Sequence, residues 1–112
     1  MPNTEQLRGN LQTIILKLLA DSDKMYGYEI TQKVRDLSEG QMLVTEGALY
    51  PTLHKLEAEG LVKTETRMIG KRVRKYYRLT KSGHLSVREK IEEFKEFIDI
   101  MVRVLNIKLM QA

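Results

Sequence analysis

The sequence predicts a small, mainly α-helical domain that carries one β-hairpin and ends in a long helix. Three observations lead to this fold class. Apolar residues recur at helical spacing in four separate segments of the chain. Residues 61–80 read as two short strands joined by a tip that contains Gly70. The chain has 112 residues, of which 42% are apolar, so it fits one domain and can bury a core.

The N-terminal part of the chain predicts two helices. Residues 5–20 form an amphipathic helix whose apolar positions are Leu7, Leu11, Ile14, Ile15, Leu18 and Leu19. Residues 21–24 break that pattern and can cap the next helix. This second helix is marked by Tyr26, Ile30, Val34 and Leu37 and stops by Gly40. Residues 42–44, Met-Leu-Val, are short and β-prone, consistent with a one-bridge strand.

The third helix has recognisable ends. Thr45 is suited to the N-cap, and Gly60 ends the helix as a left-handed cap. Leu49, Leu53 and Leu56 form the inward stripe. Pro51 would disturb a helix interior, because proline lacks an N–H and crowds the preceding turn. We therefore expect the regular helix to begin near residue 47 or 48, after an irregular turn at 45–47, which places Pro51 in the first turn.

The opposite face of the third helix is the first candidate functional surface. It carries Gly47, Tyr50, Pro51, His54 and Ala58, with Lys55 beside them. Few long charged side chains crowd this face, so it can approach a groove closely. Tyr50, His54 and Thr45 carry donors for phosphates or base edges, and a helix N-terminus favours a phosphate. The alternative is that Tyr50 and His54 are incidental surface residues, with Tyr50 packed on the second helix.

The hairpin is the second candidate surface, because its charge is strongly one-sided. Between residues 63 and 81 there are eight Lys/Arg and one acid, Glu65, an excess larger than the +4 of the whole chain. A basic hairpin after a helix-turn-helix pattern is typical of a winged helix and favours double-stranded DNA as partner. The alternative is a solvated surface hairpin, although such edges tend to mix both signs of charge. We expect DNA contacts from Thr45, Gly47, Tyr50, Pro51, His54, Lys55, Lys71, Arg72, Arg74 and Lys75.

The last helix predicts a contact between two copies of the chain. After residues 80–83, a heptad seam runs through Val87, Ile91, Phe94, Ile98, Met101, Leu105 and Lys108. A second apolar edge consists of Phe97, Ile100, Val104 and Ile107. So wide a face favours a homodimer held by Ile91, Phe94, Ile98, Met101 and Leu105, the alternative being a helix that folds back on its own core. We divide the chain into a winged helix-turn-helix DNA-binding domain, 1–83, and a C-terminal dimerisation helix, 84–112.

Composition and motifs exclude several other classes. There is no cysteine, which excludes disulfides, thiolate zinc sites and cysteine nucleophiles. His54 and His84 are the only histidines, and no HExxH, P-loop, GxGxxG or GxSxG spacing occurs. We therefore expect no metal, no cofactor and no enzymatic activity. The N-terminus does not have the pattern of a secretory signal, and no apolar run is long enough to cross a membrane, so we expect a cytoplasmic protein.

Several of these segments resemble the PadR-type transcriptional regulators. They are GALYPTLHKLEAEGLV at 47–62, RKYYRLT at 74–80, Ser82-Gly83, the opening LRGNLQTIILKLL and YGYEI at 26–30. The resemblance covers nearly the whole chain, and the single C-terminal helix is similar to the smaller subfamily. It implies a homodimeric DNA-binding regulator, most often a repressor released by a small molecule, with 45–59 as recognition helix and 61–80 as wing.

The resemblance also implies a small aromatic or drug-like effector. A gap between two last helices and two first helices around a dimer axis would admit a flat apolar molecule. The residues expected to line this gap are Leu11, Ile15, Phe94, Phe97 and Ile98. Two alternatives stay open: the phenylalanines simply fill the dimer core and no effector exists, or the winged helix serves protein–protein contact instead of DNA binding.

Overall fold

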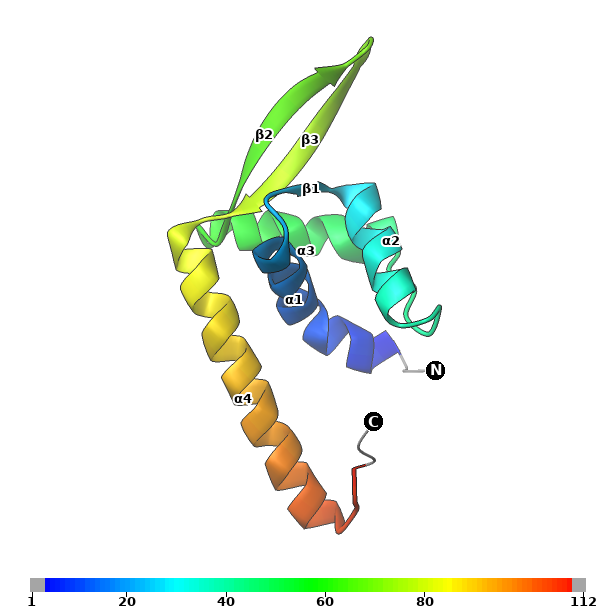
Figure 1. Ribbon diagram of the computed structural model, residues 1–112, viewed down its shortest axis with the longest axis vertical. Coiled ribbons are helices and arrows are strands. Elements are labelled where there is room, and N and C mark those ends of the chain that lie inside the picture. The colour runs from blue at the N-terminus through cyan, green and yellow to red at the C-terminus, as the bar shows by residue number, and fades with distance from the viewer. Residues whose placement is uncertain (1–3, 110–112) are drawn as a thin grey trace.

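The structure has the predicted fold class, a mainly α-helical winged helix with a long last helix. The computed structural model describes residues 4–109, and within them the chain forms four helices and three strands. In chain order these are α1 (Thr4–Asp21), β1 (Met25–Tyr26), α2 (Gly27–Leu37), α3 (Glu46–Ala58), β2 (Val62–Ile69), β3 (Arg72–Leu79) and α4 (Lys81–Leu105), shown in Figure 1. The three strands form one antiparallel sheet in the order β1-β3-β2.

The core is built around α1 and the leucine stripe of α3. Leu11 and Ile15 of α1 are at most 1% exposed, and the predicted stripe of Leu49, Leu53 and Leu56 is buried to the same degree. Tyr77 of β3 and Val87 of α4 complete the same cluster. Burying one such side chain stabilises the fold by about 1.5–3 kcal/mol. The buried stripe thereby fixes which face of α3 is turned outward.

The two ends of α3 follow from its capping residues. The Thr45 hydroxyl accepts a hydrogen bond from the Ala48 N–H at 3.2 Å, as predicted for an N-cap. Gly60 has a φ of +75°, and the Leu61 N–H returns to the Leu56 carbonyl at 2.9 Å, which confirms the left-handed cap.

The expectation that α3 starts near residue 47 or 48 is wrong. The helix begins at Glu46, because the cap at Thr45 brings residues 45–47 into the first regular turn. Pro51 therefore lies in the second turn, inside the helix. Its missing N–H and its ring are accommodated on the exposed side of α3, since Pro51 and Gly47 are both exposed.

The short strand lies elsewhere than predicted. Residues 42–44 form a loop, and the two-residue strand is β1, where Met25 pairs with Tyr77 and Tyr26 with Tyr76. Tyr26 is consequently a strand residue and the N-cap of α2 instead of part of its apolar stripe. Leu37, predicted on that stripe, is also exposed at the end of α2.

The hairpin formed by β2 and β3, which we call the wing, has the predicted tip. Ile69 pairs with Arg72 across a two-residue turn, and Gly70 at the first turn position has a φ of +63°. A positive φ at this position is what glycine supplies at low cost in tight hairpins. All of residues 66–73 are exposed, so the distal half of the wing projects into solvent.

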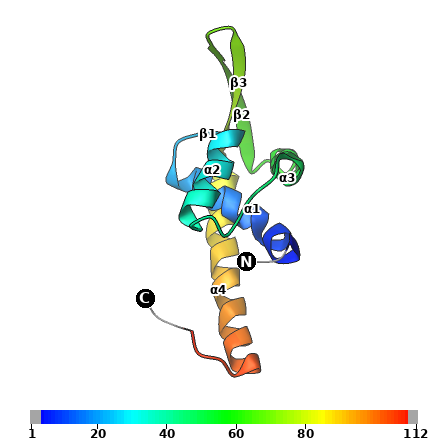
Figure 2. The same cartoon turned by 90° about the vertical axis from the view of Figure 1, so that its right-hand side faces the viewer.

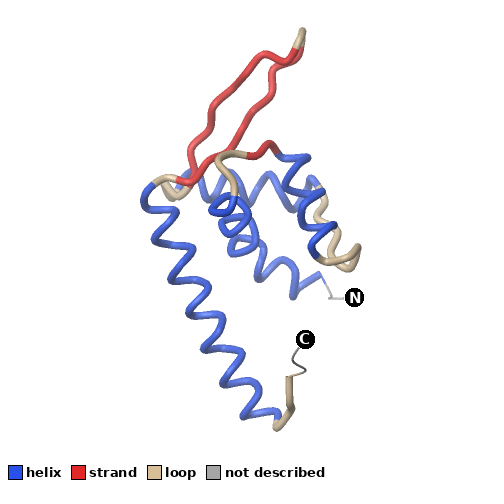
Figure 3. Tube along the Cα trace, viewed as in Figure 1, coloured by secondary structure: helices blue, strands red, loops and turns tan. Residues whose placement is uncertain are grey.

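The wing and α4 leave the body in opposite directions, as two perpendicular views and the Cα trace show (Figures 1, 2 and 3). Thr80 caps α4 by accepting from the Gly83 N–H at 3.1 Å, and it also donates to the Gly60 carbonyl at 2.6 Å. Val87 is buried in the core and Ile91 packs against it. Beyond Ile91 the helix extends away from the other elements (Figure 1).

The predicted heptad seam ends at Leu105, so its predicted last member, Lys108, is not part of α4. Asn106 adopts a left-handed conformation with a φ of +53° and terminates α4, so Lys108 and Ile107 lie beyond the helix. The predicted units 1–83 and 84–112 have ends outside the described residues. Helix α4 begins at Lys81 and runs continuously across the predicted boundary.

Candidate nucleic-acid interface

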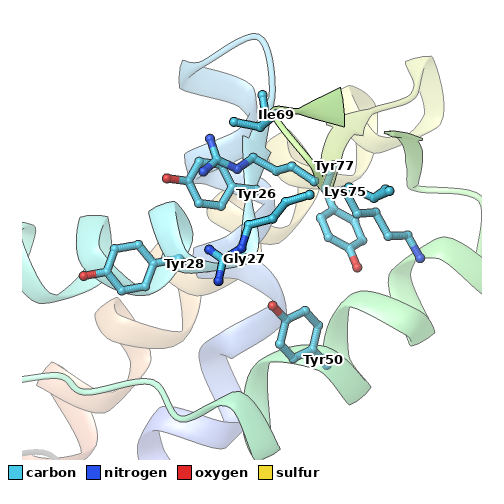
Figure 4. Close-up of a pocket in the computed structure, with 10 residues that line it drawn as sticks. Tyr26, Gly27, Tyr28, Tyr50, Ile69, Lys75 and Tyr77 are labelled. Atoms are coloured by element: carbon cyan, nitrogen blue, oxygen red, sulfur yellow. The ribbon is translucent and has the colours of Figure 1, made fainter. Parts of the chain in front are cut away.

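Tyr50 on the exposed face of α3, the start of α2 and the wing border one groove. The groove has a volume of about 740 Å³. Its lining residues are Tyr26, Gly27, Tyr28, Tyr50, Ile69, Arg72, Val73, Arg74, Lys75 and Tyr77. Figure 4 shows tyrosines from β1, α2, α3 and β3 around this groove. Aromatic rings and guanidinium groups in one concave surface provide both stacking area and positive charge.

The outward face of α3 is accessible along its length. Gly47, Tyr50, Pro51, His54, Lys55 and Ala58 are all exposed, as the helical spacing predicts. Thr45 is exposed as well, although its hydroxyl oxygen already accepts from Ala48. The hydroxyl hydrogen of Thr45, at the start of α3, and the imidazole of His54 are therefore donors available at the surface.

Tyr50 has a second contact that the sequence left as an alternative. Its hydroxyl lies so close to Gly27 that a methyl group at position 27 would overlap the Tyr50 ring. Tyr50 thus packs against the start of α2, yet 37% of its surface stays exposed to the groove. Gly27 is buried and Tyr50 points toward it from α3 (Figure 4). The contact fixes the direction of the Tyr50 ring.

The wing cations that line the groove are held by aromatic rings. The Arg74 guanidinium lies 4.0 Å from the centre of the Tyr26 ring, and Lys75 Nζ lies 5.6 Å from the centre of Tyr77. A side-chain hydrogen bond with Tyr76 raises the pKa of Arg74, so the group is charged at every pH of interest. Tyr26 and Tyr76 meet edge to face with centroids 5.6 Å apart. These contacts orient Arg74 and Lys75 before any ligand binds.

A second group of charges lies at the base of the wing. Glu65 accepts a hydrogen bond from Lys24 at 2.5 Å and lies 3.7 Å from Arg78 and 3.6 Å from Arg67. Arg78 also donates to Asp23 at 3.2 Å. Arg67 and Arg78 are therefore neutralised in part, whereas Lys71 and Arg72 at the tip form no ion pair among residues 4–109.

Tyr26 and Tyr28 were not predicted as site residues. Tyr28 is 64% exposed at the first turn of α2 and lines the same groove as Tyr50 and Arg72. Only the stretch YGYEI marked this segment in the sequence, and nothing in its spacing indicates that it lies beside the wing. Its position follows from the pairing of β1 with β3, which brings residue 26 to residue 76.

The predicted dimer residues lie along one helix that the body leaves uncovered. Ile91, Ile98 and Met101 are half-buried, whereas Phe94 and Leu105 are exposed. On the second edge, Phe97 is 56% and Val104 71% exposed. Leu11 and Ile15, predicted beside the phenylalanines at an effector site, are buried in the core of the single chain. In the single chain these two groups of residues therefore lie in different surroundings, one in the core and one on the exposed part of α4.

Metal ligands do not gather in the described part of the chain. Residues 4–109 contain no group of three or more His, Cys, Asp or Glu side chains that could hold a metal ion. Over the same range, no helix combines the length and apolar character needed to cross a membrane.

Sequence and fold comparisons agree on one class of proteins. The family described as "Transcriptional regulator PadR-like family" matches residues 15–89. "Transcriptional regulator Rv3488" of Mycobacterium tuberculosis is 39% identical over 82 residues, which cover 73% of each chain. The solved structure of a transcriptional regulator from Clostridium thermocellum has a TM-score of 0.84 at 29% identity, covering 92% of this chain and 97% of the other.

A further relative was solved with nucleic acid. The structure of Bacillus subtilis PadR in complex with operator DNA has a TM-score of 0.66 at 30% identity. The match covers 72% of this chain and 46% of that protein. The similar part is thus less than half of that protein. The fold that carries the groove between α3 and the wing is shared with a protein crystallised on its operator.

Proposed function

We propose that this chain, which belongs to the PadR-like family of transcriptional regulators, is a homodimeric repressor that binds an inverted-repeat operator through α3 and the wing. One observation carries the proposal: Tyr50, on the uncrowded outer face of α3, borders the same groove as the wing cations Arg72, Arg74 and Lys75. A face with small and donor residues fits a major groove, and flanking cations fit phosphates. The members of this family are transcriptional regulators, so the proposal includes no enzymatic activity.

The proposed DNA contacts divide into two sets. His54, Tyr50 and Thr45 lie on α3 and are assigned to base edges and nearby phosphates, with Gly47, Pro51 and Lys55 allowing or supporting the approach. Lys71, Arg72, Arg74 and Lys75 lie on the wing and are assigned to the phosphate backbone. Tyr28 joins them, because it is 64% exposed and lines the same groove as the wing cations.

The proposed dimer uses the apolar face of α4. From Phe94 to Leu105 this face exposes large side chains that no other part of residues 4–109 covers. A second copy related by a two-fold axis would bury both faces and leave the two wings free. Two α3 helices about 34 Å apart, or a near multiple, would then face successive major grooves. This geometry is the reason for proposing an inverted repeat. The proposed site of action is the cytoplasm, since a regulator of this kind acts on the DNA there.

Release by a small apolar molecule is the second part of the proposal. Phe94, Phe97 and Ile98 lie on the same face of α4 and offer more apolar surface than a simple two-helix seam requires. Because Leu11 and Ile15 are buried in the core, an effector would reach them only by repacking α1 against α4. An effector bound between two α4 helices would change the spacing of the wings, and a 10-fold loss of operator affinity needs about 1.4 kcal/mol.

Selection from a pool of randomised duplexes tests the proposal. We expect the wild-type protein to enrich one sequence made of two inverted half-sites, with binding that weakens steeply as salt rises. The competing function is a winged helix that binds another protein. Recovery of no enriched sequence, together with duplex binding that does not depend on salt, would favour that competitor and reject the repressor.

A further inference from the structure

The direction of the wing tip is fixed only at the base of the wing. Residues 66–73 are all exposed, so the distal half is not packed against the helical body. At the base, β3 pairs with the two residues of β1. So short a strand supplies few ladder hydrogen bonds, and the side chains around it must supply much of the remaining constraint.

Glu65 is the centre of the side-chain contacts at this base. Its carboxylate is bonded to Lys24, and it also lies close to Arg78, which reaches Asp23. Lys24 and Asp23 belong to the loop between α1 and β1, whereas Glu65 and Arg78 belong to the wing. The cluster therefore joins the wing to the helical body at two points.

The low exposure of the Lys24 side chain shows that its contact with Glu65 is packed. The Lys24 side chain is only 16% exposed, and its ammonium group lies 5.1 Å from the centre of the Tyr76 ring. Tyr76 is the cross-strand partner of Glu65. The bond from Lys24 is the main cause that holds the pKa of Glu65 below its usual range, so the carboxylate is ionised at neutral pH.

We propose that Glu65 is a positioning residue for DNA binding, which sets the angle between the wing and α3 through its contacts with Lys24 and Arg78. The proposal rests on the proposed function, since the angle matters only if α3 and the wing engage one duplex. Glu65 carries the one negative charge between residues 63 and 81, where eight cations lie. Its charge by itself repels phosphates, so its benefit to DNA binding must come from geometry.

The charge of Glu65 and its contacts affect DNA binding with opposite signs. Replacing Glu65→Gln removes a repulsive charge, so affinity for any duplex should rise slightly. The same change frees the base of the wing, so affinity for the one sequence that needs both surfaces should fall. A residue that acted through charge alone would raise both affinities, and one that only supported folding would lower both in parallel with stability. The Glu65 side chain is 37% exposed, and ion pairs of partly exposed carboxylates contribute little to stability, so the variant is expected to remain folded.

The experiment uses two probes and the full chain. The specific probe is the duplex that the wild-type protein enriches most strongly from the randomised pool, and the second is a scrambled duplex of the same composition. For Glu65→Gln we expect affinity for the specific probe to fall about 5-fold to 10-fold, while affinity for the scrambled probe is unchanged or rises about 2-fold. Glu39→Gln is the matched control: it removes the same charge in the loop after α2, where the side chain is exposed and has no ion pair within residues 4–109.

Substitution of Lys24 tests the same contact from its partner in the helical body. Lys24→Met should lower the ratio of specific to scrambled affinity by a similar factor, and the double variant with Glu65→Gln should be no worse than either single change. An unchanged ratio in Glu65→Gln and Lys24→Met, or fully additive losses in the double variant, would overturn the positioning role. If the wild-type protein enriches no duplex at all, it is the proposed function that fails, which is a distinguishable result.

Discussion

The wing and the outer half of α4 are both projections from one helical body, but they expose opposite kinds of surface. Between residues 63 and 81 the chain has eight basic residues and one acid, whereas α4 and the tail after His84 carry five of each sign. The wing exposes cations around aromatic rings, and α4 exposes phenylalanine, isoleucine and valine. The net positive charge of the wing fits a polyanion, and the apolar area without net charge on α4 fits a second copy of the chain.

The two contacts can therefore be separated by experiment. Contacts to phosphates release counterions and weaken steeply with salt. Burial of apolar surface is close to insensitive to moderate salt and depends on area. Changes to the wing should therefore alter the salt dependence of binding, and changes to α4 should alter the oligomeric state.

The largest effect is expected from α4. Replacing Phe94 and Ile98 together by Glu places two charges on the uncovered apolar face and should yield a monomer. A monomer reaches one half-site at a time, so operator affinity should fall on the order of 100-fold. Sedimentation would measure the state of assembly, and Arg103→Glu on the opposite side of α4 is the control. A double variant that sediments as the wild-type dimer would remove α4 from the interface.

A smaller and uniform loss is expected at the wing tip. Replacing Lys71 and Arg72 by Ala removes two exposed cations and should weaken binding to every duplex about 10-fold, with a salt slope lower by about one for each lost phosphate contact. Arg88→Ala with Arg103→Ala makes the same charge change on α4. Equal slopes for the tip variant and this control would mean that the tip does not touch DNA.

A loss of stability is expected where Tyr50 of α3 packs against Gly27 of α2. Gly27→Ala places a methyl group against the Tyr50 hydroxyl and ring, which should cost about 1–3 kcal/mol and turn Tyr50 away from its present direction. Tyr50→Phe removes the closest atom, so Gly27→Ala combined with Tyr50→Phe should recover part of the loss. Chemical denaturation would measure both, and the contact would be unimportant if the second substitution restored nothing.

The smallest effect is a pH dependence at the base of the wing. The pKa of Glu65 is lowered in the folded chain, so its contribution to stability is present above the ordinary value of 4.5 and is lost as pH falls through the folded pKa. The difference in stability between the wild type and Glu65→Gln should therefore shrink below pH 4.5. A difference that stays constant from about pH 7 to about pH 3 would show that the ionised carboxylate is not what stabilises this contact.

Much of this architecture follows from local sequence signals. The leucine stripe of α3, the cap at Thr45, the left-handed Gly60 and the hairpin tip depend on residues close in the chain, and all were predicted. Three features were missed, and of these only strand β1 depends on a tertiary contact. Strand β1 exists only because β3 lies beside it. The start of α3 and the end of α4 at Asn106 are set by how Thr45 and Asn106 adopt cap geometries.

The sequence predicted the outer face of α3 and the wing as DNA-binding surfaces, but not the tyrosines at the start of α2. Periodicity placed His54 outward on α3, and charge counting identified the wing. Tyr26 and Tyr28 join them only because the β1–β3 pairing carries the start of α2 to the groove. The packing of Tyr50 on Gly27 likewise depends on how closely α2 and α3 approach.

In the proposed complex, α3 reads the DNA sequence and the wing supplies general affinity. Repeating the duplex selection with His54→Ala tests this division most directly, because His54 is exposed in the middle of the outer face of α3 and has no hydrogen bond or ion pair within residues 4–109. We predict that the enriched sequence changes at the same position of both half-sites, while the wing-tip double variant enriches the wild-type sequence more weakly. An unchanged sequence from His54→Ala, or a changed one from the wing-tip variant, would contradict this division of roles.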